Sequence, residues 1–345
     1  MNILNICDSE DWDIVSYQAL HTAARFLKTG HNAAVLCQKK SRLYAECAKL
    51  KINARPITLG VKFGFFETEG WDIVHFYNPV ALNPLALKKA RASSKIFVTQ
   101  LKLGSSRAFE RLASLEPYID RYIAACNSVQ EEFTRVGIDQ RKTFMVPPTL
   151  NTGRWESAML IKPAMFLKRP YRVGTVSMDA SFRDQELFLL MAKEVLAVQP
   201  NTNFLLVGSK SERIRDLARQ LDISHKVDIL WDRNDMPEVM AMLHIFAKTA
   251  TREGMSLSLI EAQASGVACV IPRLRGLSDF TVNDRSGVIV EPGDVLSYTR
   301  AVLYLINNPP VCHTMSKTAF EYVHNNMSPP VVCNILLGLY EDAAG

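Results

Sequence analysis

Short apolar runs alternate with helical segments along almost the whole chain, and this alternation constrains the fold more than any other feature. In residues 1–150 we expect five clear strands and a sixth at Ile3–Cys7, Ala33–Cys37, Ile73–Phe76, Ile96–Thr99, Tyr122–Ala125 and Thr143–Val146. Segments with apolar residues at helical spacing separate most of these runs. Strands that alternate with helices are typical of a parallel sheet covered by helices.

A second series of the same kind follows a break in the pattern. After Pro147-Pro148 the periodicity is poor as far as Arg169-Pro170, so we predict an interdomain linker over residues 151–170. Beyond it, strands are expected at Arg172–Ser177, Asn203–Val207, Lys226–Leu230, Ile245–Lys248, Ala268–Ile271 and Gly287–Val290. Helical segments then run from Val295 to the C-terminus.

The two series predict an α/β fold with two Rossmann-like, doubly wound domains that face a central cleft. We assign residues 1–150 and 171–326 to these domains, and we expect the last helix, residues 327–345, to pack back toward the N-terminal domain. A chain of 345 residues has room for a core in each. In such folds ligands gather at the carboxyl ends of the strands, so candidate site residues belong in the loops that follow strands.

Cysteines and terminal segments exclude several classes of protein. The seven cysteines are scattered singly without Cys-x-x-Cys spacing, so we predict reduced thiols and no zinc site. The N-terminus lacks the basic start and long apolar core of a signal peptide. The apolar stretch Val331–Tyr340 is far shorter than the ~20 residues that span a bilayer. We therefore expect a cytoplasmic protein without a membrane span.

The net charge of +5 is concentrated in the N-terminal half, where 20 Lys and Arg face 14 Asp and Glu. Basic segments there include Lys39–Arg42, Lys49 with Lys51, and Lys88–Arg91. A solvated face is the simpler interpretation, and peripheral contact with an anionic membrane surface at its inner face, or with an acidic acceptor, is the alternative. Nucleic acid is not an expected partner, because aromatic residues do not interleave the basic runs.

The segment from Arg252 to Gly266 follows a predicted strand and carries the most chemistry. Gly254 permits a tight turn, Ser256 can cap a helix and Gly266 can end it, so the helix offers unpaired N–H groups to an anion. Glu253 lies at the mouth of the turn, and Glu261 lies about two turns inside the helix on the same side. Taken alone, these carboxylates could simply complement the helix dipole and a neighbouring cation.

The whole segment resembles the Glu-x7-Glu signature of the family 4 glycosyltransferases. Further segments resemble that family in series: Ala264–Ala268, Asn283–Asp294, the domain junction Val146–Asn151 and the strand Phe204–Gly208. The resemblance implies the GT-B fold and a retaining, metal-independent hexosyltransferase of polysaccharide biosynthesis. Its donor would be a nucleotide sugar, UDP-sugar first and GDP-sugar second. Its acceptor would be a glycan, a lipid-linked molecule or a small molecule, and no cofactor is expected.

The resemblance also assigns roles to residues. Glu253 would hydrogen-bond the donor sugar and orient its anomeric carbon, and Glu261 would bind the ribose hydroxyls, since a carboxylate accepts two hydroxyl protons. The backbone of Gly254, Met255, Ser256 and Leu257 would approach the donor phosphates.

The phosphate contacts depart from the family pattern. The family places an Arg and, five residues on, a Lys after the first strand of the C-terminal domain; here these positions hold Met178 and Arg183. A charge-assisted hydrogen bond contributes about 1.5–3 kcal/mol, so the missing cation should weaken donor binding unless another replaces it. Our hypothesis is that Arg275 compensates, and an ordinary surface arginine is the equal alternative.

The N-terminal domain departs further. Where family members often carry a glycine pair after the first strand, this chain has Asp8–Asp13. We take Asp8, Trp12 and His75 as acceptor-side candidates, although Trp12 as a helix anchor and His75 as a core residue are the simpler interpretations. Asp11-Trp12-Asp13 matches the Asp-x-Asp metal motif of the GT-A fold. A match of three residues is weak evidence, and the two strand-helix series contradict the single-domain GT-A layout. We therefore predict no metal.

Catalysis would then rest on positioning by Glu253 and on stabilisation of the leaving diphosphate by Arg183 and the helix terminus. The sequence contains no P-loop and no nucleophile with a base at recognisable spacing. Two alternatives stay open: a GT-B nucleotide-sugar epimerase, and a non-catalytic nucleotide-sugar-binding partner subunit.

Overall fold

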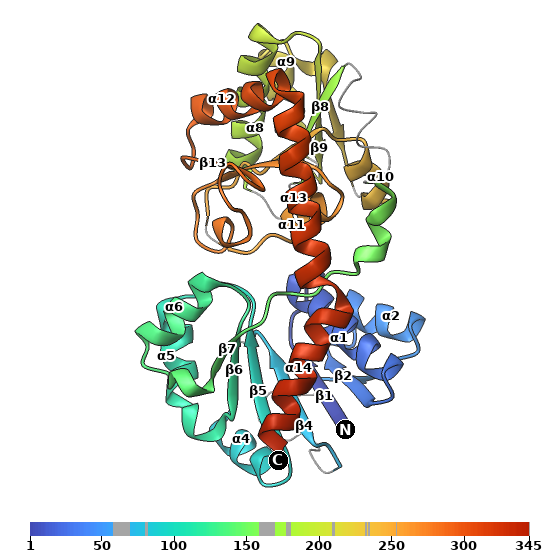
Figure 1. Ribbon diagram of the computed structural model, residues 1–345, viewed down its shortest axis with the longest axis vertical. Coiled ribbons are helices and arrows are strands. Elements are labelled where there is room, and N and C mark those ends of the chain that lie inside the picture. Colours follow the sequence, from blue (N-terminus) through green and yellow to red (C-terminus); the bar gives the residue numbers. More distant parts are fainter. Residues whose placement is uncertain are drawn as a thin grey trace. The chain divides into compact units, whose positions relative to one another are not determined.

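The computed structural model describes residues 1–57, 70–79, 82–158, 170–176, 181–208, 211–231, 233, 235–252 and 254–344. The chain divides into two compact units (Figure 1). The first unit comprises Met1–Asn151 and Asn326–Gly345, and the second comprises Thr152–Asn325. Each contains one parallel sheet with helices packed on it, so the predicted α/β fold with two doubly wound domains is confirmed.

The sheet of the first unit, within the described residues, has seven parallel strands in the order β3-β2-β1-β4-β5-β6-β7. The strands are β1 (Asn2–Cys7), β2 (Asn32–Cys37), β3 (Asn53–Pro56), β4 (Ile73–Tyr77), β5 (Lys95–Gln100), β6 (Arg121–Ala124) and β7 (Thr143–Met145). Successive strands are added outward on one side from β1 and on the other side from β4, so the strand order reverses between these two neighbours. By the general rule for open α/β sheets, the carboxyl ends of these two strands mark this unit's ligand edge.

Six α-helices in the described part of the first unit pack on this sheet: α1 (Ile14–Lys28), α2 (Arg42–Lys49), α4 (Pro84–Arg91), α5 (Ser106–Ser114), α6 (Asn127–Arg135) and α14 (Pro329–Ala344). Short 3₁₀ turns are η1 (Glu116–Tyr118) and η2 (Gln140–Lys142). The C-terminal helix α14 crosses the sheet beside β5 in Figure 1. Its Tyr340 is fully buried, with ring centroids 4.7 Å from Phe97 and 5.8 Å from Phe26. The last helix is therefore part of the first unit's core.

The sheet of the second unit, over the residues that can be described, has six parallel strands in the order β10-β9-β8-β11-β12-β13. They are β8 (Tyr171–Val176), β9 (Thr202–Val207), β10 (Val227–Leu230), β11 (Ile245–Ala247), β12 (Ala268–Pro272) and β13 (Gly287–Val290). In this sheet the strand order reverses between the neighbours β8 and β11. The ligand edge of this unit accordingly lies beyond Val176 and Ala247.

Helices of the second unit surround this sheet: α8 (Phe182–Val198), α9 (Glu212–Gln220), α10 (Met236–Ala241), α11 (Leu257–Ala264), α12 (Val295–Asn307) and α13 (Pro309–Met327), whose last residues belong to the first unit. The 3₁₀ turns are η3 (Thr152–Arg154), η4 (Ser224–Lys226) and η5 (Ser278–Phe280). Gly174 in β8 leaves room for Leu243, because a Cβ on Gly174 would lie 2.6 Å from the end of the Leu243 side chain. All seven cysteines of the chain are buried, as expected for thiols that pack as small hydrophobes.

Two features of the fold differ from the sequence prediction. The strand β3 was not predicted, because Asn53–Pro56 is an edge strand of mainly exposed residues and has no apolar run. The predicted linker over residues 151–170 is described only to residue 158 and at residue 170. Its described beginning from Thr152 already groups with the second unit, where Trp155 is buried and only 2 % exposed. An aromatic side chain of that size anchors a segment that composition alone identifies as a connector.

Candidate functional site

The helix α11 begins at the ligand edge of the second unit, as the Gly254–Gly266 pattern predicts. Ser256 is the N-cap, and its hydroxyl accepts a hydrogen bond from the Leu259 N–H at 3.3 Å. Gly254 has φ of +140°, a conformation that a residue with a side chain rarely adopts. Met255 lies in the turn before the cap, and Leu257 is the first residue of the helix. Glu253 lies outside the described residues.

The turn at Gly254 is joined to the loop after β12. The Gly254 N–H donates to the Arg275 carbonyl at 3.0 Å. Gly276 has φ of +81°, and a Cβ on it would lie 3.0 Å from the backbone carbon of Gly254. The two loops therefore meet backbone to backbone, and this contact places the half-buried Arg275 beside the turn that precedes α11.

Glu261 projects from the second half of α11, four residues beyond Leu257 and so on the same side of the helix. The side chain is half-buried. Burial raises the pKa of the Glu261 carboxyl to about 8, and the positive charge of Arg154 opposes this shift. Arg154, an exposed residue of η3, was not identified from the sequence, because nothing in the pattern around Val146–Asn151 distinguishes it from a linker residue.

The first turn of α8 is attached to the loop after β11 through Asp184. Ser181 and Asp184 form a capping box, with the Asp184 N–H 3.3 Å from the Ser181 hydroxyl and the Ser181 N–H 3.1 Å from the Asp184 carboxylate. The other carboxylate oxygen accepts from the Thr251 hydroxyl at 2.7 Å, and the Asp184 carbonyl accepts from Thr249 at 2.7 Å. The neighbouring Arg183 is exposed on this turn. Met178 lies outside the described residues.

Asp184 was also missed, although the sequence contains its signal. Ser181 and Asp184 have the Ser-x-x-Asp spacing of a helix start, and α8 begins at Phe182, directly after this cap. The capping box thus places Arg183 in the first turn of α8, two residues after the N-cap Ser181.

In the second unit, the first turn of α8 and the loops after β11 and β12 lie at the same edge of the sheet. This edge offers the N–H groups at the start of α11, the cations Arg183 and Arg275, and the half-buried carboxyl of Glu261. A helix N-terminus and cations favour phosphate groups, and a carboxylate accepts hydroxyl protons. The arrangement is chemically suited to a molecule that carries both phosphates and hydroxyls.

The loop after β1 in the first unit is organised by Asp13. Its carboxylate caps α1 by accepting from the Val15 and Ser16 N–H groups at 3.0 Å each, and it also forms an ion pair with Lys102. These interactions already occupy the second carboxylate of Asp11-Trp12-Asp13. Among the residues that the structure describes, no group of three or more His, Cys, Asp and Glu is placed to hold a metal ion.

The acceptor-side candidates fall in two different environments. Asp8 and Trp12 are half-buried in the loop after β1, at the ligand edge. The Arg42 guanidinium lies 4.9 Å from the Trp12 ring centroid, and Tyr17 contacts the same ring edge to face at 6.3 Å. Trp12 thus anchors the start of α1 and is held in place by a cation.

His75 is a core histidine instead of an acceptor-side residue. It is fully buried within β4, where Nε2 lies 2.6 Å from the Thr99 hydroxyl and Nδ1 lies 2.5 Å from the Tyr340 hydroxyl. Burial lowers the pKa of His75 to about 3, so the ring is neutral. The sequence favoured a core role for His75 but could not identify its hydrogen-bond partner, because Tyr340 is 265 residues away in the chain.

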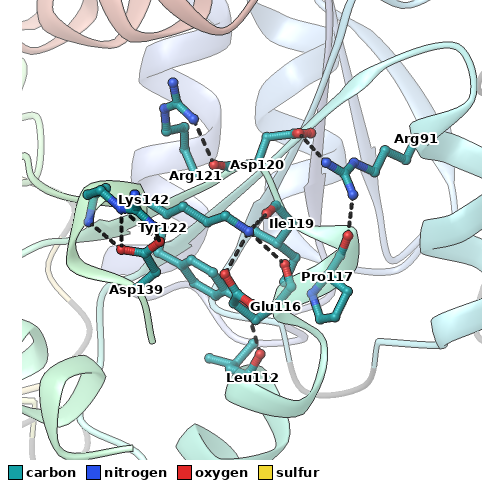
Figure 2. Close-up of polar contacts among 11 residues, drawn as sticks. Arg91, Leu112, Glu116, Pro117, Ile119, Asp120, Arg121, Tyr122, Asp139 and Lys142 are labelled. Atoms are coloured by element: carbon teal, nitrogen blue, oxygen red, sulfur yellow. Dashed lines mark hydrogen bonds and ion pairs between the residues drawn. The ribbon is translucent and has the colours of Figure 1, made fainter. Parts of the chain in front are cut away.

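Several cations of the basic N-terminal half are matched by oxygen acceptors near the start of β6 (Figure 2). Arg91 donates to Asp120 at 3.2 Å, and Lys142 pairs with Glu116 at 2.6 Å. On α4, Lys88 and Lys89 are exposed. No helix in the described ranges combines the length and apolarity needed to cross a membrane.

The sequence profile of the family described as Glycosyl transferases group 1 matches residues 171–322, which lie in the second unit. Relatives include a UDP-Gal:alpha-D-GlcNAc-diphosphoundecaprenol alpha-1,3-galactosyltransferase of Escherichia coli, 26% identical over 37% of this chain and 34% of its own length. An N-acetyl-alpha-D-glucosaminyl L-malate synthase of Bacillus anthracis is 26% identical over 46% of this chain and 42% of its own length. The matched segment thus spans well under half of each of these relatives.

Solved structures resemble the chain over nearly its whole length. A glycosyltransferase from Rickettsia africae gives a TM-score of 0.84 at 16% identity, with 99% of this chain and 98% of that chain covered. Anabaena Alr3699/HepE in complex with UDP gives 0.83 at 15% identity, with 99% and 100% covered. At such low identity this likeness shows the fold alone. The chain therefore has the two-domain GT-B fold of glycosyltransferases, and its residues 171–322 match the Glycosyl transferases group 1 family.

Proposed function

We propose that this chain is a retaining hexosyltransferase that transfers a hexose-type sugar from a nucleotide diphosphate to an acceptor in polysaccharide biosynthesis. The donor is a UDP-sugar in the first place and a GDP-sugar in the second. The observation that carries this proposal is the glycine-to-glycine junction of Gly254 and Gly276, which leads directly into the helix that bears Glu261. It joins an anion-binding turn to a hydroxyl-binding carboxylate at the ligand edge of one sheet.

The names of similar proteins support the donor and the acceptor class. The Escherichia coli relative is named for UDP-Gal and a diphosphoundecaprenol acceptor. The Anabaena neighbour has been crystallised with UDP and with UDP-glucose. For this chain we accordingly propose a UDP-sugar donor and a glycan, lipid-linked or small-molecule acceptor.

For the site residues we propose the roles that the family resemblance implies. Glu261 binds the ribose hydroxyls, and Glu253 hydrogen-bonds the donor sugar and orients its anomeric carbon. As the bond to the anomeric carbon breaks, negative charge grows on the leaving diphosphate, and Arg183 with the N-terminus of α11 stabilises that charge. The leaving phosphate takes the proton of the acceptor hydroxyl, so the protein supplies positioning more than proton transfer.

Arg275 provides a second cation in this proposal and compensates for the uncharged Met178. Its carbonyl is already fixed against Gly254, so its side chain starts beside the turn that approaches the phosphates. We propose that these side chains carry the phosphate charge without a metal ion. Full activity in EDTA is expected, and an Arg275→Ala variant that binds UDP as tightly as the parent would overturn the role of Arg275.

The test of the nucleotide site is a thermal-shift series with UDP, GDP and ADP. A ligand that binds only the folded protein at 100 times its Kd stabilises it by about 2.7 kcal/mol, so UDP should raise the Tm most. A response to none of the three would contradict the donor site altogether.

Turnover separates the proposed transferase from its alternatives. With a UDP-sugar and an acceptor, the parent should form a product that retains the anomeric configuration, and Glu253→Gln should abolish turnover while leaving the fold intact. Conversion of the donor without an acceptor would indicate an epimerase. Nucleotide binding without turnover in any acceptor screen would indicate a binding subunit.

A further inference from the structure

The helix α4 of the first unit has a basic stripe with a leucine on its exposed side. The opposite side buries three small or apolar residues, Ala86, Leu87 and Ala90. Leu85, Lys88 and Lys89 are exposed. They have the spacing i, i+3 and i+4, so they lie next to one another on one side of the helix. We call these three residues the α4 stripe.

The two lysines of the α4 stripe are not neutralised by neighbouring acids. Arg91, at the end of the same helix, pairs with Asp120 at 3.2 Å and also donates to the Pro117 carbonyl (Figure 2). By contrast, neither Lys88 nor Lys89 has a hydrogen-bond or ion-pair partner among the residues that the structure describes. In the sequence, residues 73–109 contain six Lys and Arg and no Asp or Glu. The α4 stripe therefore presents an excess of positive charge to its surroundings.

Leu85 adds an apolar side chain to this charge. It is 77% exposed, more than any other large apolar side chain that the structure describes. Its backbone N–H donates to the Asn83 side chain at 2.9 Å, so the leucine extends from a fixed helix start. Lysines in the last turn complement the helix dipole, but the dipole does not explain an exposed leucine at the second helical residue. A lipid surface takes both groups, because ammonium groups contact anionic headgroups and an apolar side chain enters the acyl boundary.

We propose that the α4 stripe is the surface through which this protein contacts an anionic lipid membrane. This role rests on the proposed function, since a lipid-linked acceptor lies in a membrane, and it names the residues that make the contact. Charge complementarity favours a lipid surface as the occupant. A stable protein partner is disfavoured because its interface buries at least about 1,000 Å², far more than one leucine side chain offers.

The test measures binding of the whole protein to vesicles of phosphatidylcholine, with and without phosphatidylglycerol. The parent should bind only the vesicles that contain phosphatidylglycerol, and about 1 M NaCl should release it. A basic residue near an anionic surface contributes about fivefold in affinity, so Lys88→Gln combined with Lys89→Gln should weaken binding about twenty- to thirtyfold. Leu85→Ser should weaken binding about tenfold, because the buried apolar area is lost.

The chain offers a matched control for each change. Lys39→Gln combined with Lys40→Gln removes an exposed lysine pair from the same unit and should keep the affinity within about threefold of the parent value. Leu296 is the second residue of α12, is 58% exposed and donates to its cap residue as Leu85 does, so Leu296→Ser should leave binding unchanged. The comparison of Leu85→Ser with Leu296→Ser, together with the salt dependence of the parent, remains informative if the double lysine variant does not fold.

Failure of this role and failure of the proposed function are distinguishable. A parent that binds UDP but not the phosphatidylglycerol vesicles overturns only the role of the α4 stripe, whereas a parent that binds none of UDP, GDP and ADP overturns the proposed function. Equal losses in the two double lysine variants would indicate a general attraction of charge and overturn the role of the stripe. Binding to soluble polyglutamate without binding to vesicles would indicate an acidic protein partner and overturn it as well.

Discussion

At the scale of single residues, the carboxyl of Glu261 has the property with the clearest consequence. It is half-buried on α11, and burial raises its pKa to about 8 against an ordinary value of 4.5, with Arg154 opposing the shift. The carboxyl is therefore largely protonated at neutral pH. A protonated carboxyl has lost acceptor capacity, so the proposed contact with two ribose hydroxyls requires the ionised form.

Nucleotide binding should consequently depend on pH. We expect UDP affinity to rise as the pH passes through about 8 and to level off about one pH unit above that value, with release of up to one proton on binding at pH 7. Calorimetry in two buffers with different ionisation enthalpies measures both quantities. Glu261→Gln should lose this dependence, and the comparison with the parent cancels the titration of the ligand's own phosphate. An equal pH profile in both proteins would contradict the role of Glu261.

The same shift has the opposite effect on stability in the absence of ligand. Because the folded-state pKa is raised, the stabilisation that it represents is complete below pH 4.5 and is lost as the pH rises through about 8. Glu261→Gln should therefore gain stability relative to the parent across this range. A carboxylate that costs stability when ionised yet is needed for binding is typical of a functional site.

At the scale of elements, the contact between the loops after β11 and β12 determines the shape of the phosphate turn. Gly276→Ala places a Cβ 3.0 Å from the Gly254 backbone and also imposes a side chain at φ of +81°. The conformation alone should cost about 1–2 kcal/mol of stability. The displaced Gly254 turn should in addition weaken UDP binding, which titration calorimetry would measure.

A matched control separates these two effects. Gly293 has φ of +76°, but a Cβ there would have no atom within 4 Å. Gly293→Ala should therefore lose a similar amount of stability without any loss of UDP affinity. If Gly276→Ala and Gly293→Ala bound UDP equally well, the junction of the two loops would not shape the binding site.

Elements are also the scale at which the sequence was most informative. Buried strands such as β1 and β11 appear as apolar runs, because both of their faces are covered by helices. The edge strand β3 was missed because its residues are mainly exposed. The starts of α1 and α8 are set by the cap residues Asp13 and Ser181, which are polar side chains that hydrophobic periodicity does not identify.

The site was predictable only where its residues are neighbours in sequence. The turn at Gly254 and the position of Glu261 on α11 follow from local spacing. Arg154 does not, because its relevance depends on which turns and helices are neighbours in space. Likewise, Asp184 and Thr251 are 67 residues apart, and only the strand order brings them together.

At the scale of the whole molecule, the two units have separate sheets and separate cores, although the chain passes between them twice. The first unit is completed by α14, whose Tyr340 hydroxyl bonds the buried His75. The second unit holds the proposed nucleotide site. A perturbation of either one should therefore act mainly on that unit's own unfolding transition.

This separation predicts two transitions in scanning calorimetry that respond to different changes. UDP should raise only the transition of the second unit. Tyr340→Phe leaves a buried ring nitrogen of His75 without its partner. It should lower the free energy of unfolding of the first unit by about 1–3 kcal/mol and leave the transition of the second unit unchanged. Ile335→Ala, a change at a side chain on α14 that is 41% exposed, should move neither. A single transition that both UDP and Tyr340→Phe displace would show that the units unfold together, and the stability of the nucleotide site would then depend on the C-terminal helix of the other unit.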